Sequence, residues 1–209
     1  MLRLFYAPGA CSLASHIALE EAGAHYDATM IDLKHGQQRT AEYMAVNPLG
    51  RVPALVTDRG TLTESPAILA FIAQSYPDAK LANLGDPFAF AQQQAFNMFL
   101  ATTVHAFFGQ VYRPARHADG EAAAAALKAR GGEVLDNAFA LIDQRLADGR
   151  PYVHGDQYSV SDPYLLVFER WFARGDAGHP ERCNHLQPHR QRVEQRAAVQ
   201  RVLKAEGLT

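Results

Sequence analysis

The first thirteen residues constrain the fold more than any other stretch of the chain. Residues 2–6 (Leu-Arg-Leu-Phe-Tyr) form a mostly apolar run that predicts a buried strand. A Pro-Gly pair at 8–9 ends the run, and the apolar residues that follow have helical spacing. The sequence therefore predicts a strand, a tight turn and a helix, with Cys11 and Ser12 at the start of the helix.

The position of Cys11 allows two interpretations. The free N–H groups and partial positive charge of a helix start stabilise a thiolate, which would lower the thiol pKa below about 8.5. Ser12 could cap the helix or donate a hydrogen bond to a sulfur atom. Alternatively, Cys11 is a small buried apolar side chain, as unpaired cysteines usually are. This stretch alone does not decide between the two.

Composition limits the kind of partner and the cellular location. The formal net charge of −2 argues against nucleic acid or an anionic membrane as the main partner, since both favour a basic face. No apolar stretch reaches the length that spans a bilayer, and the N-terminus lacks the pattern of a signal peptide. The two cysteines, Cys11 and Cys183, are expected to be reduced, and the protein is expected to be cytoplasmic.

The order of predicted elements divides the 209 residues into two parts. The first part alternates strand, helix, strand, helix, strand, strand, helix, with strands at 2–6, 26–33, 54–56 and 61–62 and helices from 12, at 41–45 and from 64. A stretch rich in Asp, Asn, Gly and Pro follows at 78–86. Helices are predicted at 88–112, 122–146, 164–168, 185–195 and 197–205. Residues 159–162 (Ser-Val-Ser-Asp) resemble a capping box before the apolar helix.

Two segments carry a more specific signal. They are Asn-Pro-Leu-Gly-Arg-Val-Pro-Ala-Leu at 47–55 and Thr-Glu-Ser-Pro-Ala-Ile at 63–68. With the order of elements, they resemble the cytosolic glutathione transferases over the whole chain. Residues 6–12, with Asn97 and His105, are similar to the bacterial beta class, in which a cysteine replaces the usual catalytic Tyr or Ser. The resemblance implies an α/β thioredoxin-like N-terminal domain (1–77), a linker (78–86) and an all-α C-terminal domain (87–209).

The resemblance implies that the first domain binds glutathione as a co-substrate. In the family the peptide before the equivalent of Pro53 is cis, which would let the Val52 backbone pair with glutathione as a short strand does. The start of the helix at Glu64 and Ser65 suits the γ-glutamyl ammonium and carboxylate groups. Helix-dipole compensation by Glu64 and helix capping by Ser65 are the structural alternatives.

The loop at 34–39 is expected to hold the glycyl end of glutathione, with Lys34 and Gln38 as ligands. This loop is shorter than in typical beta-class members. Ala106 also stands where those members usually carry a lysine, and the loss of a cation weakens binding of a dianionic ligand. Arg51 or Lys34 could compensate.

Four residues are predicted to be catalytic by the resemblance: Cys11, His105, Tyr6 and Ser12. The ring of His105, neutral or charged, would hydrogen-bond the thiolate, and Tyr6 is a reserve donor to the sulfur. Structural alternatives are an ordinary helix residue for His105 and a packed strand residue for Tyr6. Asn97 would reach the glutathione of the partner subunit in a homodimer. The other histidines share no metal-ligand spacing, so we predict no metal site.

The predicted function is conjugation of glutathione to small apolar electrophiles, a detoxification reaction. Helical-domain aromatic residues would line the electrophile site: Phe107, Phe108, Tyr112 and Trp171. As a thiolate, Cys11 could also carry glutathione as a mixed disulfide in thiol–disulfide exchange. Two alternatives are another glutathione-dependent enzyme, such as a dehalogenase, isomerase or peroxidase, and a non-enzymatic ligand-binding or regulatory protein.

Overall fold

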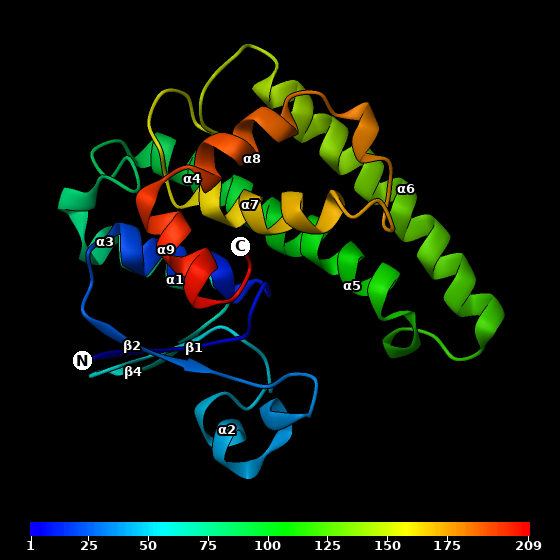
Figure 1. Ribbon diagram of the computed structural model, residues 1–209, viewed down its shortest axis with the longest axis horizontal. Coiled ribbons are helices and arrows are strands. Elements are labelled where there is room, and N and C mark those ends of the chain that lie inside the picture. Colours follow the sequence, from blue (N-terminus) through cyan, green and yellow to red (C-terminus); the bar gives the residue numbers. More distant parts are fainter.

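A four-stranded sheet lies between the helix Ala41–Val46 and the other helices in the computed structural model, which describes residues 1–209 (Figure 1). The strands are β1 (Leu2–Tyr6), β2 (Tyr26–Met30), β3 (Ala54–Thr57) and β4 (Gly60–Thr63), in the spatial order β2-β1-β3-β4. β1 is parallel to β2 and antiparallel to β3, which pairs antiparallel with β4. The second strand is shorter than predicted, because Asp32 turns the chain by accepting the N–H groups of Lys34 and His35.

The helices of this first part lie on both faces of the sheet. α1 (Ser12–Glu21) and α3 (Ser65–Ser75) cover one face, and α2 (Ala41–Val46) lies on the other, after a short 3₁₀ turn, η1 (Gln37–Arg39) (Figure 1). Residues 12–19 of α1 are all buried, because this helix also contacts α7 and α9 of the second part. α1 therefore lies between the sheet and the helical domain.

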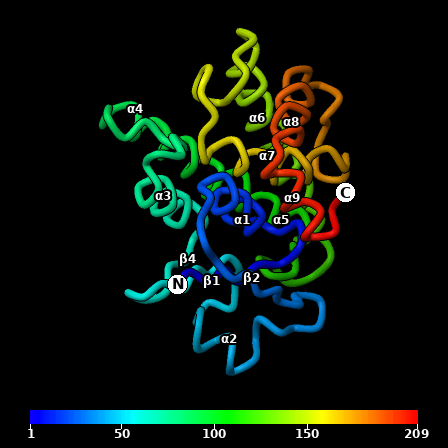
Figure 2. Tube along the Cα trace, turned by 60° about the vertical axis from the view of Figure 1, so that its left-hand side comes forward, coloured from blue at the N-terminus to red at the C-terminus, as the bar shows by residue number.

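The second part is helical, as predicted, and stacks on α1 and α3 (Figure 2). Its helices are α4 (Pro87–Phe99), η3 (Leu100–His105), α5 (Ala106–Tyr112), α6 (Glu121–Leu146), α7 (Ser161–Phe172), α8 (Leu186–Glu194) and α9 (Ala197–Ala205). Three short 3₁₀ turns connect elements: η2 (Pro77–Ala79), η4 (Pro114–Arg116) and η5 (Pro180–Arg182). None of the helices combines the length and the hydrophobicity of a bilayer-spanning segment.

The predicted helix 88–112 changes its winding in the middle. Residues Leu100–His105 form a π-helix, η3, between the α-helical segments α4 and α5. A π-turn closes i→i+5 hydrogen bonds, so it rotates the residues after it relative to a regular α-helix, and such turns are frequent at functional sites. The apolar pattern predicted a continuous helix here, and the structure adds that His105 lies at the end of the π segment.

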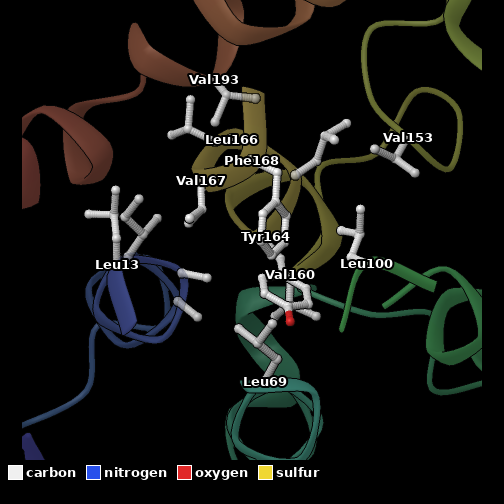
Figure 3. Close-up of a cluster of buried hydrophobic side chains, with 14 of the residues drawn as sticks. Leu13, Leu69, Leu100, Val153, Val160, Tyr164, Leu166, Val167, Phe168 and Val193 are labelled. Carbon is white, nitrogen blue, oxygen red and sulfur yellow. The ribbon is translucent and has the colours of Figure 1, made fainter. Parts of the chain in front are cut away.

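One core joins the two parts of the chain. It contains 37 buried residues from the sheet, α1, α3 and the later helices, and α7 runs through its centre (Figure 3). Leu13 of α1 and Leu69 of α3 face Tyr164, Val167 and Phe168 of α7 (Figure 3). A second cluster of four residues packs under α2: Ala7, Ile31, Tyr43 and Val52. A site at the junction is therefore supported by a core that both parts share.

A buried polar network holds the start of α7. Asp162 accepts the Ser159 N–H at 2.7 Å and the Val153 N–H at 2.8 Å, and the first of these bonds is one half of the capping box that residues 159–162 resemble. The His189 ring lies 3.1 Å from the Asp162 carboxylate and 2.9 Å from that of Glu169. Burial alone would lower the pKa of His189, but the Glu169 charge and the Asp162 hydrogen bond outweigh it and raise the pKa to about 10. An imidazolium between two carboxylates therefore links α7 to α8.

His189→Gln should destabilise the protein by about 3 kcal/mol near neutral pH, because it leaves two buried carboxylates without their cation. Because the pKa of His189 is higher in the folded state than in the unfolded state, protonated His189 stabilises the fold. This stabilisation is complete below the unfolded-state pKa of about 6.5 and falls as the pH rises toward 10. Urea unfolding at several pH values should thus show a difference from the parent that shrinks above pH 6.5. His185→Gln, at a partly exposed pair with Asp143, is the control. Equal losses in both variants, or no pH trend, would contradict this account.

Candidate functional site

Predicted residues from three separate segments meet at the start of α1. Cys11 precedes the helix and is 9% exposed, and its Sγ donates a hydrogen bond to the Val52 carbonyl at 3.3 Å. The Ser65 side chain lies close enough to the Cys11 thiol to lower its pKa, and the charge of Glu64 raises it. The fold therefore brings Cys11, Val52, Glu64 and Ser65 together, as the resemblance implies.

Of the two interpretations of Cys11, the structure favours the buried thiol over the stabilised thiolate. Burial raises the pKa of the thiol to about 11, and the Glu64 carboxylate adds to this. The hydrogen bonds from Ser65 and from the backbone N–H groups at the helix start lower the pKa by less than burial raises it. At neutral pH the ligand-free thiol is thus protonated and acts as a hydrogen-bond donor.

Two other predicted catalytic residues have contacts elsewhere. The buried Ser12 hydroxyl accepts the Ala7 N–H at 3.1 Å and donates to the Ala7 carbonyl at 3.3 Å. Ser12 thus closes the turn before α1, and its predicted roles as helix cap or sulfur donor are wrong, because Cys11 occupies the capping position. The Tyr6 ring packs on His16 with ring centres 4.9 Å apart and has no hydrogen bond to Cys11.

The segment before Pro53 has the cis peptide bond that the resemblance implies. The Val52–Pro53 peptide is cis, and the Val52 N–H has no acceptor within the chain. The Arg51 carbonyl accepts the Tyr43 hydroxyl at 2.6 Å and the Asn47 side-chain amide at 2.7 Å, which fixes the segment. Its free Val52 N–H, and a carbonyl that only the Cys11 thiol uses, can pair with an extended peptide.

Glu64 has a strained backbone. Its φ is +67° and its ψ is +121°, a region that residues with a side chain rarely adopt. Its carbonyl still accepts the Ile68 N–H at 3.1 Å and begins α3, while its exposed carboxylate forms no ion pair with a basic side chain. Strain of this kind is typical of functional sites. Ser65 is 5% exposed beside it.

His105 lies at the junction of the two parts. Its ring packs against Phe168 and Trp171, each with ring centres 5.5 Å apart. Burial, followed by the charges of Arg51 and Arg113, lowers the pKa of His105 to about 4. The ring is therefore neutral near pH 7, which decides between the two protonation states that the sequence allowed.

The loop expected to hold the glycyl end is anchored by Asp32 rather than by its own basic residues. Lys34 is exposed and forms no ion pair, and only its backbone N–H is held, by the Asp32 carboxylate at 3.0 Å. The Gln38 side-chain N–H donates to the Leu33 carbonyl, and its buried Oε1 has no partner. The Lys34 ammonium group and the side-chain oxygen of Gln38 thus have no hydrogen-bond partner in the protein.

The role predicted for Asn97 is wrong. Asn97 is wholly buried in α4, and its Oδ1 accepts the Ser161 hydroxyl at 2.8 Å. Its side chain thus points into its own helical domain and cannot reach a ligand held by another subunit. The sequence pattern placed it correctly on a helix but did not show which face of that helix is buried.

The structure adds a residue that the sequence did not single out. Tyr164 of α7 is 1% exposed, and its hydroxyl points toward α3 (Figure 3). Burial mainly raises the pKa of its hydroxyl, followed by the proximity of Cys11 and Glu64, and the Ser65 side chain opposes the rise. A tyrosine in an otherwise apolar helix needs a partner for its hydroxyl, and this signal could have identified it.

Two of the aromatic residues predicted to line the electrophile site make other contacts: Phe108 in the core, and Tyr112, which is 36% exposed, at the surface. Phe108 is 1% exposed and stacks on Tyr112 and Phe168. The Tyr112 hydroxyl donates to the Asp176 carboxylate at 2.7 Å. Trp171 remains half-buried and lies beside His105, as a residue near the site should.

Comparison with known proteins identifies the family. Residues 1–74 match the model of the glutathione S-transferase N-terminal domain, and residues 123–205 match that of the C-terminal domain. The chain is 34% identical to glutathione S-transferase GstA of Escherichia coli O157:H7 over 209 residues, which cover 99% of this chain and 100% of that protein. The chain belongs to the glutathione S-transferase family.

Solved structures agree with this assignment. A glutathione transferase homologue from Sulfitobacter, with bound glutathione, superposes with a TM-score of 0.91 at 33% identity and covers 100% of this chain and 99% of its own. The beta-class glutathione S-transferase of Sphingomonas chungbukensis gives 0.86 at 36% identity, with 99% and 100% covered. These matches confirm the predicted fold class, a thioredoxin-like α/β domain followed by a helical domain.

The pKa of Cys11 can be tested by alkylation with iodoacetamide. In a Cys183→Ser protein without glutathione, the rate should rise about tenfold per pH unit above neutral pH, because only the thiolate reacts. The rise should continue toward a pKa of about 11, and Ser65→Ala should lower the rate at each pH. A plateau below pH 8.5 would show that the helix start outweighs burial.

Proposed function

We propose that the protein conjugates glutathione to small apolar electrophiles. The observation that carries this proposal is the convergence of Cys11, Val52, Glu64 and Ser65 at the start of α1. We assign residues 1–77 to glutathione binding, 78–86 to the linker and 87–209 to the domain that covers the electrophile. The glutathione bound in the Sulfitobacter homologue supports the choice of co-substrate.

Glutathione is proposed to lie along Val52 with its γ-glutamyl end at α3. The Val52 N–H and carbonyl pair with the cysteinyl part, after the Cys11 thiol turns from the carbonyl to the ligand. The carboxylate of Glu64 pairs with the γ-glutamyl ammonium group. The Ser65 hydroxyl and the first N–H groups of α3 bind the γ-glutamyl carboxylate.

The glycyl carboxylate is proposed to lie beside Arg51, with Lys34 as a second cation. Arg51 is exposed, forms no ion pair, and lies close enough to His105 for its charge to lower the pKa of that ring. Arg39 and Arg113 are also exposed and without carboxylate partners. These cations compensate for the alanine at position 106, where beta-class members usually carry a lysine.

Cys11 and His105 are proposed to stabilise the glutathione thiolate as neutral hydrogen-bond donors. The protonated thiol and the neutral imidazole each offer one hydrogen to a sulfur anion in a site with little water. This arrangement favours conjugation over thiol–disulfide exchange, because exchange requires Cys11 itself as a thiolate. Exchange through Cys11 would thus be a minor activity that grows with pH.

A homodimer is proposed on the exposed face of α4. Phe88 is 72% exposed and Met98 is 48% exposed, and Ala91 and Ala95 lie between them at helical spacing. An apolar stripe of this kind on a surface helix is suited to a second copy of the chain. We further propose a cytoplasmic location, since both cysteines are unpaired.

Calorimetric titration of reduced glutathione near neutral pH tests the proposed binding mode. Saturable binding is expected, and Glu64→Gln should weaken it about tenfold, because a charge-assisted hydrogen bond to the ammonium group is lost. Glu42→Gln, which changes an exposed carboxylate in the first turn of α2, is the matched control. If the folded parent binds no glutathione, the non-enzymatic alternative replaces this proposal.

Cys11→Ala separates the two activities. Conjugation to a chlorodinitrobenzene should fall but remain measurable, since His105 and Ser65 are still present. Exchange with a glutathione mixed disulfide should be lost, because it requires the Cys11 sulfur. An equal loss of both activities in a folded variant would contradict this division.

A further inference from the structure

The turn that carries Cys11 is held from the opposite domain. The Gly9 N–H donates to Oε2 of Glu206 at 2.9 Å, and the Gly9 carbonyl accepts the indole N–H of Trp171 at 2.9 Å. Glu206 follows α9 and Trp171 belongs to α7, so both contacts come from the helical domain. Both peptide groups of Gly9, two residues before Cys11, are therefore held by residues more than 160 positions away.

The Glu206 carboxylate joins this turn to α1. Its Oε1 lies 2.8 Å from Nδ1 of His16, and the side chains of the pair are 0% and 5% exposed. A buried carboxylate is costly unless each oxygen has a partner, and here Gly9 and His16 supply one each. The same side chain thus fixes the turn before α1 and the body of α1.

The end of the chain packs against Gly9 as well. The Leu208 carbonyl accepts a hydrogen bond from Arg170 at 3.0 Å, which holds the last residues on α7. A Cβ at position 9 would lie 3.4 Å from Cδ2 of Leu208, and the φ of Gly9 is +66°. A side chain at position 9 would be strained by this positive φ, which glycine adopts without cost, while its Cβ would make an ordinary contact with Leu208.

Trp171 contacts both the turn that carries Cys11 and the ring of His105. Its indole N–H holds the Gly9 carbonyl, and its ring packs edge-on against His105. A cavity of about 350 Å³ borders Gly9, Trp171 and Leu208, so packing on that side of the turn is incomplete. The hydrogen bonds of Trp171 and Glu206 therefore hold the turn from the helical domain, in addition to the Ser12 hydroxyl, which closes it from within.

We propose that Glu206 and Trp171 are positioning residues for catalysis: they hold the turn at Gly9, and through it Cys11, at a fixed place against the helical domain. The proposal rests on the proposed function for its catalytic meaning, but the position of Cys11 can be measured without glutathione. Neither residue touches the sulfur, so both act through the backbone of the turn. Displacing a catalytic group by about 1 Å can cost about a hundredfold in rate.

The test compares Glu206→Ala, Glu206→Gln and Arg201→Gln in a Cys183→Ser protein. Glu206→Ala should raise the rate of Cys11 alkylation by iodoacetamide about tenfold at a given pH, because the freed turn opens and exposes the buried thiol. Glu206→Gln keeps an acceptor for the Gly9 N–H, so its alkylation rate should stay close to that of the parent. Arg201→Gln removes the α9–α1 ion pair with Glu20 without touching the turn and should change nothing.

Two further readouts separate positioning from general loss of stability. The fluorescence emission of Trp171, the only tryptophan, should shift to longer wavelength in Glu206→Ala but not in Arg201→Gln. The two variants are compared under conditions in which their free energies of unfolding are equal. If the parent is an active transferase, Glu206→Ala should lower kcat for conjugation more than it raises KM for the electrophile. Trp171→Phe, which removes the indole donor, replaces Glu206→Ala in the alkylation and kinetic comparisons if the latter does not fold.

Two outcomes would overturn the proposal. One is an alkylation rate and pH profile in Glu206→Ala equal to those of Arg201→Gln. The other is a Glu206→Gln variant as altered as Glu206→Ala, since the acceptor oxygen would then not be what holds the turn. Failure of the parent to bind glutathione would instead reject the proposed function and leave the alkylation comparison unaffected.

Discussion

The packing of α1 between the sheet and the helical domain is the constraint on which the rest of the structure depends. Residues 12–19 of this helix are buried, and its contacts with α3, α7 and α9 join both parts of the chain in one core. Cys11 stands at the first turn of this helix, so the helix that joins the domains also places the sulfur. The domain junction and the candidate site are therefore one structural unit.

Burial also determines the chemistry of the two groups nearest the proposed reaction. It raises the pKa of Cys11 and lowers that of His105, so each favours its neutral form. Two neutral hydrogen-bond donors suit a site that stabilises the thiolate of a bound thiol, because neither places a second negative charge beside it. A helix start in water would have stabilised the Cys11 thiolate itself, and burial reverses that outcome.

The parts of the site that could be predicted lie in contiguous motifs that carry the family resemblance. Val52 before a proline, and Glu64-Ser65 before a helical proline, belong to such motifs, and the structure has the cis peptide and the helix start that the resemblance implies. The prediction failed for Ser12 and Asn97, whose side chains each found a nearer polar partner inside the core. Partners of that kind depend on which face of a helix is buried, and the helical pattern leaves this open.

The sequence by itself determined the order of strands and helices, the division into an α/β part and a helical part, and the motifs that identify the family, because these depend on short-range periodicity and turn residues. Tertiary structure alone decided the protonation of Cys11 and His105, the contact of Tyr164 with Ser65, and the hold of Glu206 and Trp171 on Gly9. Each of these depends on water exclusion or on a contact between residues far apart in the chain. Neither is visible until the helical domain packs on α1.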